Sequence, residues 1–160
     1  MKFILPILFI FLNFTKLNSQ TKIITENLIN EIISDQPYLG LVLNPKSFIP
    51  ELNNELKKDE NFKYTMKEVN EKDFNLYFDK SHRSKILDWR EYNIKSVKYS
   101  PSKYTLQIST PLFIKNNTEV LFQIKTEFSN SFQIYKCLKN KCSLSYSFGN
   151  KIIPIQNKIK

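Results

Sequence analysis

The chain has 160 residues and a formal net charge of +9, and it holds two glycines, two cysteines and one histidine. This length fits one ordinary domain with a hydrophobic core of its own. Two glycines are too few for a glycine-rich phosphate-binding loop or a nucleophile elbow, which argues against a nucleotide-dependent enzyme. Lysine supplies most of the positive charge, because Arg83 and Arg90 are the only arginines. Specific phosphate recognition usually relies on arginine, so we expect no nucleic-acid partner.

Residues 1–19 are predicted to be a secretory signal peptide. They carry a positive charge at Lys2, continue with a run that is apolar apart from one proline, and end at a small residue, Ser19. The apolar core is too short for a membrane-spanning helix, and no cysteine follows it to carry a lipid. We therefore expect residues 20–160 to form a single secreted or periplasmic domain without a transmembrane segment. Cleavage would remove two lysines and no acidic residues, lowering the net charge from +9 to +7.

Two or three helices are predicted in the N-terminal part of this domain. Residues 22–34 carry isoleucines and leucines at helical spacing, and Pro37 ends the pattern. Pro50 suits the first turn of a second helix, which would continue to about Lys58. A third helix is predicted over residues 67–79, followed by a basic polar connector.

Residues 94–153 are predicted to form the C-terminal sheet. Apolar and polar residues alternate in four runs, which is typical of half-buried strands. The runs are 104–114, 120–128, 132–138 and 142–148, and further strands are expected near 94–99 and 152–153. Short polar turns make neighbouring strands antiparallel. The predicted fold is therefore α+β, with the helices packed on one face of an antiparallel meander of four to six strands. Polar positions such as Gln123 would face water.

Cys137 and Cys142 are predicted to form a disulfide, because two cysteines so close in an exported chain suggest one. A two-residue turn at 139–140 would place them directly opposite each other. A three-residue turn would instead pair Ile134 with Tyr146 and unite the apolar residues of both strands on one face, with the cysteines on opposite faces. A one-residue change of register reverses every side chain, so only a β-bulge would allow both pairings.

Four adjacent residues, Asp88, Trp89, Arg90 and Glu91, gather two carboxylates and an arginine around the only tryptophan. In an extended strand, the first and third side chains would point to one side and the second and fourth to the other. One hypothesis is a polar contact patch at the mouth of a cleft. The alternative is a tryptophan anchored in the core and flanked by surface ion pairs.

His82 is the single histidine and lies in a basic loop-like stretch. A metal site built from histidine, cysteine and carboxylate side chains needs three or four ligands, and none are spaced suitably around it. The sequence therefore predicts no metal site and no cofactor, and it assigns no catalytic residue.

Three short motifs resemble a group of small exported bacterial proteins that have no known activity. The motifs are Glu71-Lys72-Asp73, Asp88-Trp89, and Ser109-Thr110-Pro111-Leu112-Phe113 ahead of an asparagine-rich turn. The resemblance covers roughly residues 65–150. It implies a signal peptide, N-terminal helices and a C-terminal antiparallel sheet. Some members have a turn rich in cysteine and glycine and a late tryptophan, both of which this chain lacks.

The expected function is that of a non-enzymatic exported protein that binds a partner or a small apolar ligand. The ligand site would lie between the sheet and the first helix. One alternative is a hydrolase acting on envelope material, using Asp88 or Glu91 with His82. The other is an electrostatic binder of anionic surfaces, which the net positive charge suggests.

Overall fold

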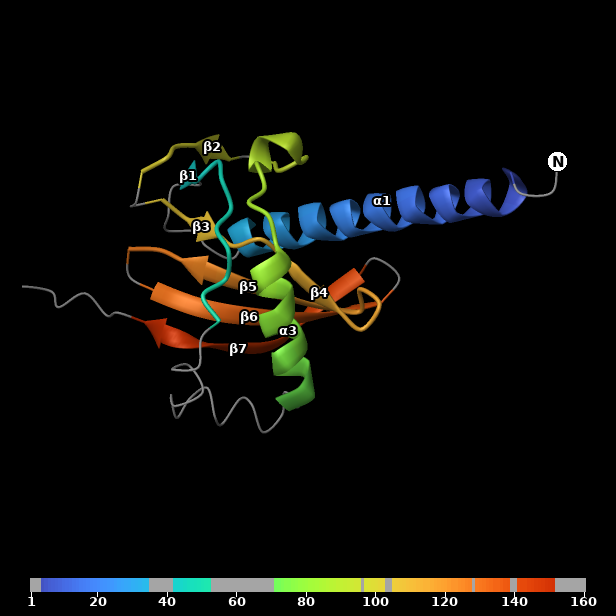
Figure 1. The fold of residues 1–160 in the computed structure, drawn as a ribbon. Helices are drawn as coiled ribbons and strands as arrows, with labels where there is room; N and C mark the ends of the chain where they lie inside the picture. The colour runs from blue at the N-terminus through green and yellow to red at the C-terminus, as the bar shows by residue number, and fades with distance from the viewer. Residues whose placement is uncertain are drawn as a thin grey trace, which may run out of the picture.

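The computed structural model describes residues 4–34, 42–52, 71–95, 97–102, 105–127, 129–138 and 141–151. Two α-helices lie in these ranges, α1 (Ile4–Ser34) and α3 (Glu71–Arg83), together with a 3-10 helix, η2 (Trp89–Glu91). The main sheet has the order β3-β5-β6-β7, with β4 also paired to β5 (Figure 1). Its strands are β3 (Gln107–Ile108), β4 (Leu112–Ile114), β5 (Glu119–Lys125), β6 (Ser129–Leu138) and β7 (Lys141–Lys151). The α+β class and the antiparallel sheet are confirmed.

The helix predicted over residues 22–34 is confirmed as the C-terminal part of α1, which begins earlier, at Ile4. The side chains described in α1 start at Ser19, and the buried ones lie on one stripe from residue 24 onward. They are Ile24, Thr25, Leu28, Ile29, Ile32 and Ile33. The part of the α1 packing surface that the structure describes lies after the predicted cleavage point. No helix among the described residues is long and apolar enough to cross a bilayer.

Helices cover both faces of the sheet, whereas the sequence predicted one covered face. On β5, Val120, Phe122 and Ile124 pack in a core with the α1 stripe. Leu121 lies on the opposite face and packs in a second core that includes Phe74 of α3. Figure 1 shows α1 and α3 on opposite sides of the strands. The middle of the sheet is therefore closed off from water on both sides.

Gln123 corrects the expectation that every polar position of β5 faces water, because it is 1 % exposed. Its amide oxygen accepts a hydrogen bond from the backbone N–H of Glu51 at 2.7 Å, and its amide nitrogen donates to Asn130 at 2.9 Å. Its own backbone N–H donates to the hydroxyl of Ser109. A buried amide costs little when its hydrogen bonds are made, which explains why a polar residue can occupy this position.

The run 104–114 was predicted as one strand, and the structure divides it into β3 and β4. Both pair antiparallel with β5. Pro111 lies at the break, and proline cannot donate a hydrogen bond to a sheet. Just before it, the N–H of Thr110 donates to the carbonyl of Phe48 instead of to β5, at 2.8 Å. The 42–52 segment therefore supplies the hydrogen-bond partner at the break between β3 and β4.

The third predicted helix is confirmed from Glu71 onward and extends further toward the C-terminus than predicted, while residues 67–70 lie outside the described residues. α3 ends at Arg83, so the stretch Ser81–Arg83, predicted as part of a connector, is helical. Its last turn carries basic side chains, which favour a helix C-terminus. The second predicted helix is not seen at Glu51 and Leu52, which are non-helical, and its remainder lies outside the described residues, as does the strand predicted at 152–153.

The strand expected near 94–99 forms outside the main sheet. β2 (Lys98–Tyr99) pairs parallel with β1 (Val42–Leu43) in a separate two-stranded sheet. The 42–52 segment, which contains β1, also forms two isolated bridges beside β3, one between Leu43 and Leu106 and one between Phe48 and Ser109.

Candidate functional site

The end of the sheet formed by β6 and β7 carries a disulfide between Cys137 and Cys142, whose Cα atoms are 4.0 Å apart. The two cysteines are directly opposite each other, as are Leu138 and Lys141, which is the pairing predicted for a two-residue turn. The disulfide expected from the spacing is therefore present. Both cysteines pack with the core that contains α1.

The competing register is also present, further along the same two strands. Ile134 pairs with Tyr146, as the three-residue turn would require, because a β-bulge shifts the register between Ile134 and Tyr135. One extra residue on β7, Ser145, separates the two registers. Phe132 and Phe148 consequently share a face, and their rings stack 5.1 Å apart. The bulge thus allows the disulfide on one face and the aromatic packing on the other.

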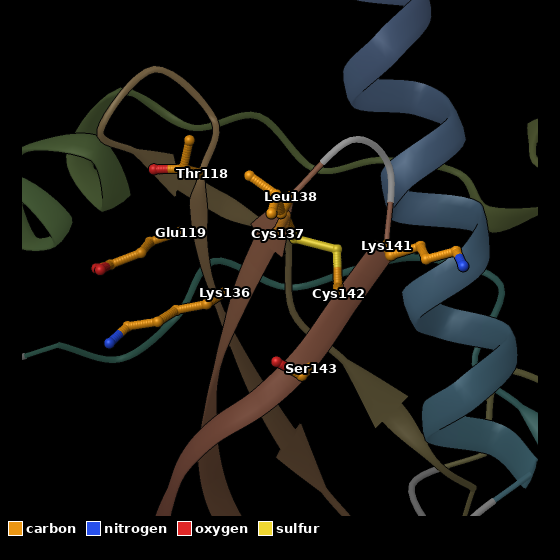
Figure 2. A pocket seen from close by; sticks show the side chains of 8 residues that line it. All are labelled: Thr118, Glu119, Lys136, Cys137, Leu138, Lys141, Cys142 and Ser143. Carbon is orange, nitrogen blue, oxygen red and sulfur yellow. A yellow bond between two sulfur atoms is a disulfide. The ribbon is translucent and has the colours of Figure 1, made fainter.

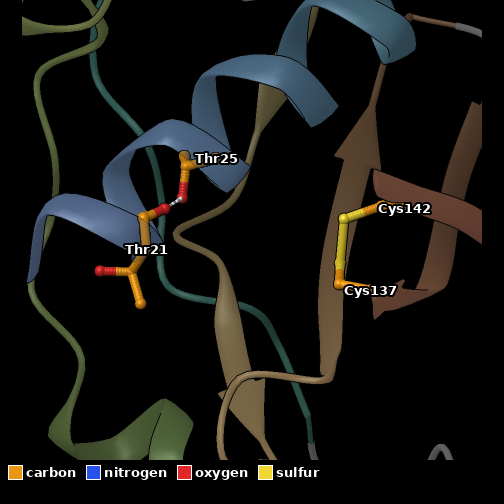
Figure 3. The surroundings of a disulfide bond; sticks show 4 residues. All are labelled: Thr21, Thr25, Cys137 and Cys142. Carbon is orange, nitrogen blue, oxygen red and sulfur yellow. Dashed lines mark hydrogen bonds between the residues drawn. A yellow bond between two sulfur atoms is a disulfide. The ribbon is translucent and has the colours of Figure 1, made fainter. Parts of the chain in front are cut away.

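The disulfide side of the sheet lies next to α1. Figure 3 shows the turn of α1 that carries Thr21 and Thr25 beside the two cysteines. Thr25 is buried, and its hydroxyl donates a hydrogen bond to the backbone carbonyl of Thr21 at 2.8 Å. A threonine is tolerated there because its hydroxyl is satisfied within the helix.

A depression of about 520 Å³ lies at the same end of the sheet. It is lined by both cysteines and by Thr118, Glu119, Lys136, Leu138, Lys141 and Ser143 (Figure 2). In Figure 2, the amino groups of Lys136 and Lys141 extend to opposite sides of the disulfide. No described carboxylate forms an ion pair with either lysine. The lining therefore combines apolar atoms with two lysines and one carboxylate, that of Glu119, which is opposite Lys136 in the pairing of β5 with β6.

Two of the large apolar side chains that remain exposed lie on this hairpin. Leu138 is 75 % exposed and Leu144 is 49 % exposed. Leu144 pairs with Tyr135, one residue before the bulge. Side chains alternate between the two faces of a hairpin, so Leu144 and the disulfide lie on one face and Leu138, Lys136 and Lys141 on the other. We call these residues, which together surround the end of the hairpin, the hairpin surface.

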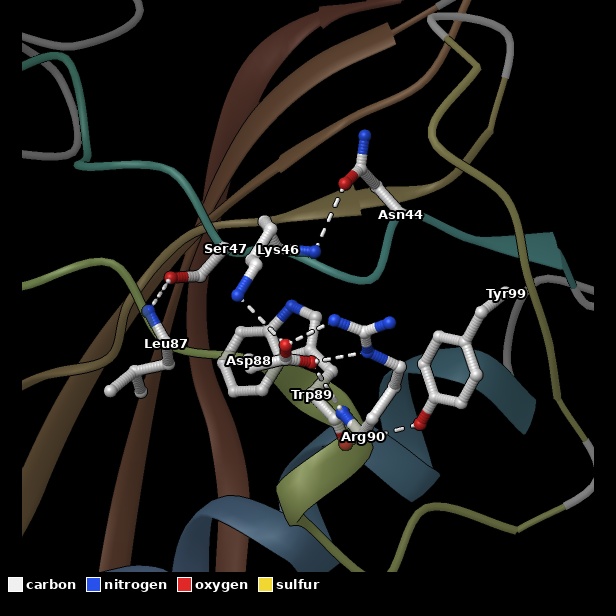
Figure 4. A network of polar contacts seen from close by, with 8 residues as sticks. All are labelled: Asn44, Lys46, Ser47, Leu87, Asp88, Trp89, Arg90 and Tyr99. Carbon is white, nitrogen blue, oxygen red and sulfur yellow. Dashed lines mark hydrogen bonds and ion pairs between the residues drawn. The ribbon is translucent and has the colours of Figure 1, made fainter.

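The sequence-predicted patch at 88–91 is a turn and not a strand (Figure 4). Asp88 caps η2 by accepting a hydrogen bond from the backbone N–H of Arg90 at 3.1 Å. Its carboxylate also pairs with the Arg90 guanidinium and with Lys46 Nζ, the latter at 2.8 Å. Hydrogen bonds from Arg90, and then from Lys46, hold the pKa of Asp88 well below its usual range.

Trp89 is fully buried in the α1 core, and its backbone N–H donates to the carbonyl of Pro45. The hydroxyl of Tyr99 donates to the Trp89 carbonyl at 3.1 Å. This geometry matches the alternative of a core tryptophan flanked by surface ion pairs. The side chain of Asp88 is already occupied by cations of the same chain, so the cluster ties the 42–52 segment to η2.

His82 is not joined to these acids by any hydrogen bond of the described residues. Its Nδ1 lies 2.9 Å from the carbonyl of Phe78, one helical turn earlier, and its ring packs against the Phe78 ring. The described residues hold no group of three or more side chains of His, Cys, Asp or Glu that could bind a metal. The hydrolase hypothesis thus gains no geometric support from His82, Asp88 and Glu91.

One ionic cluster was not predicted from the sequence. Lys115 Nζ lies 2.6 Å from Asp73 of α3 and 3.0 Å from Glu119 of β5. The hydrogen bond that Lys115 donates to the Asp73 carboxylate contributes most to raising the pKa of Lys115. Tyr77 is buried nearby, its hydroxyl has no hydrogen-bond partner among the described residues, and burial raises its pKa far above the usual range. These residues come from separate segments, so no local pattern indicates the cluster.

No protein-family model, no curated protein and no solved structure matches this chain. The resemblance to small exported bacterial proteins therefore stays a prediction.

Proposed function

We propose that the protein works outside the cytoplasm as a non-enzymatic binding protein, and that a protein partner contacts the hairpin surface. The disulfide supports this location, because disulfides persist in oxidising compartments. The predicted signal peptide agrees with it. Of the two kinds of binding expected from the sequence, we favour a protein partner over a small apolar ligand enclosed between α1 and the sheet.

The observation that carries the proposal is the exposure of Leu138 and Leu144 beside one disulfide. Single exposed apolar residues are ordinary on protein surfaces. These two share a hairpin whose end is covalently closed, and Leu138 also lines the 520 Å³ depression. A surface that is fixed before binding loses less conformational entropy when a partner docks.

The space proposed for a small apolar ligand is occupied by the core. Phe122 is fully buried and Ile124 is nearly so, and both pack with the α1 stripe. Any ligand between the sheet and α1 would have to displace these side chains. Contact with the hairpin surface requires no such displacement.

In-cell photo-crosslinking tests the proposal in the cells that make the protein. A photoreactive amino acid replaces Leu138 or Leu144, and the matched control replaces Ile86, which is 62 % exposed and lies between α3 and η2. We expect one discrete heavier product from positions 138 and 144 and none from position 86. Equal labelling at all three positions, or none at 138 and 144, would refute the proposal.

A further inference from the structure

The direction of the main chain at the hairpin follows from one hydrogen bond. The backbone N–H of Cys137 donates to the carbonyl of Thr118 at 2.7 Å, so this residue points its polar main-chain groups toward β5 and away from β7. The pair Cys137–Cys142 is therefore a non-hydrogen-bonded pair of the β6–β7 ladder. It follows that the N–H and C=O of Cys142 point away from β6, to the outer edge of the sheet.

The same alternation can be followed along β7. Leu144 is opposite Tyr135, two residues before Cys137, so its main-chain groups also point outward. After the bulge, Ser147 is opposite Gln133 and again points outward. β7 is the last strand in the sheet order, and no described residue pairs with its outer side. The edge thus offers main-chain donors and acceptors at Cys142, Leu144 and Ser147.

An open edge can accept an extended polypeptide as an additional strand, with main-chain hydrogen bonds giving affinity and flanking side chains giving specificity. Here the lysine on the edge strand itself is Lys141, which forms no ion pair with a described carboxylate, and Lys136 lies one strand inward on β6. Leu138 and Leu144 supply apolar contacts beside them.

We propose that the outer edge of β7 binds an extended polypeptide segment that carries acidic side chains, which adds to the sheet as a further strand. The inference rests on the proposed function and specifies its partner. Charge complementarity selects this occupant over a second copy of the chain, because copies with a net charge of +7 after the predicted cleavage repel one another. A lysine and a bulge on an edge strand discourage self-association, and Lys141 of β7 also attracts an acidic strand.

The test uses the purified, natively processed protein and a synthetic peptide in which glutamate alternates with valine. The control peptide has lysine in place of every glutamate. Amide hydrogen exchange of β7 and fluorescence anisotropy are measured with each peptide. We expect binding of the glutamate peptide that weakens with salt, with slowed exchange at Cys142 and Leu144. Binding of the lysine peptide should be at least about tenfold weaker.

Two kinds of variant separate main-chain pairing from charge. Leu144→Pro removes one outward N–H and leaves the β6–β7 hydrogen bonds in place, and Leu144→Ala is its control with the N–H retained. We expect Pro to weaken binding by roughly fivefold or more relative to Ala, from loss of one hydrogen bond. The double variant Lys136→Glu with Lys141→Glu keeps the backbone intact and should weaken binding roughly tenfold.

Three results would each overturn the inference. They are equal binding of the two peptides, unchanged amide exchange at Cys142 and Leu144, and a concentration-dependent dimer in which β7 pairs with a second copy of the chain. If crosslinks form at Leu138 and Leu144 in cells but the glutamate peptide does not bind, strand addition fails and the proposed function stands. If neither crosslinks nor peptide binding occurs, both fail.

Discussion

Cys137 and Cys142 are opposite each other on β6 and β7, and their disulfide closes the hairpin between the β-bulge and the turn. Replacing both with serine should lower the free energy of unfolding by about 2 kcal/mol, because the closed loop is short and restrains the unfolded chain only modestly. Urea unfolding of the two proteins measures this difference.

Reductant provides the control for the disulfide. It should lower the urea midpoint of the wild-type protein and leave the double serine variant unchanged. A double variant as stable as the oxidised wild type would show that the hairpin is held by packing alone.

Gly149 and Asn130 approach each other too closely for any other residue at position 149. A Cβ atom there would lie 2.2 Å from the Asn130 carbonyl oxygen, and the backbone φ is +153°. Gly149→Ala should therefore destabilise the protein by roughly 2 kcal/mol or more. Ser147→Ala is a matched control on the same strand and should change stability by less than about 0.5 kcal/mol in thermal unfolding.

Tyr77 and Tyr135 are both buried, but only one hydroxyl is paired. Tyr135 donates to the amide oxygen of Gln133 at 2.7 Å, whereas the hydroxyl of Tyr77 has no partner among the described residues. Tyr77→Phe should leave stability unchanged or raise it by about 1 kcal/mol, and Tyr135→Phe should lower it by about 1 kcal/mol. Denaturant midpoints of the two variants compare them directly, and a larger loss for Tyr77→Phe would contradict the assignment.

Asp88 stabilises the fold through its ionised form, because Arg90 and Lys46 lower its pKa. A carboxyl group whose folded pKa is lowered adds stability above its unfolded pKa of about 3.9, and this stability is lost as the pH falls toward the folded value. Asp88→Asn keeps an oxygen to cap η2 and removes the ion pairs. Its melting temperature should be a few degrees below wild type near pH 7. The gap should narrow below about pH 4, and a gap independent of pH would contradict this account.

Local patterns predicted the elements whose burial follows a regular period. The isoleucine stripe of α1 repeats at helical spacing, and the strands β5 to β7 alternate, so the class of fold could be predicted. The capped turn at 89–91 also has a local signal that the prediction did not use, since aspartate is a preferred N-cap and Asp88 directly precedes Trp89.

Other features depend on residues distant in the sequence. Gln123 is buried because Glu51 and Asn130 complete its hydrogen bonds. Lys115 meets Asp73 only because α3 packs against β4 and its turn. The sequence identified two incompatible registers for β6 and β7 but not the position of the bulge that accommodates both. Periodicity within one segment carries no information about such tertiary partners.

The central claim, that this domain folds outside the cytoplasm with its hairpin closed, is tested most directly by the intact mass of the natively extracted protein, with and without thiol alkylation. We predict a chain that begins near Ser19 or Gln20, is two hydrogens lighter than its reduced form, takes up no alkylating agent until it is reduced, and carries no added ligand mass. A full-length chain with both cysteines alkylated before reduction would contradict the claim.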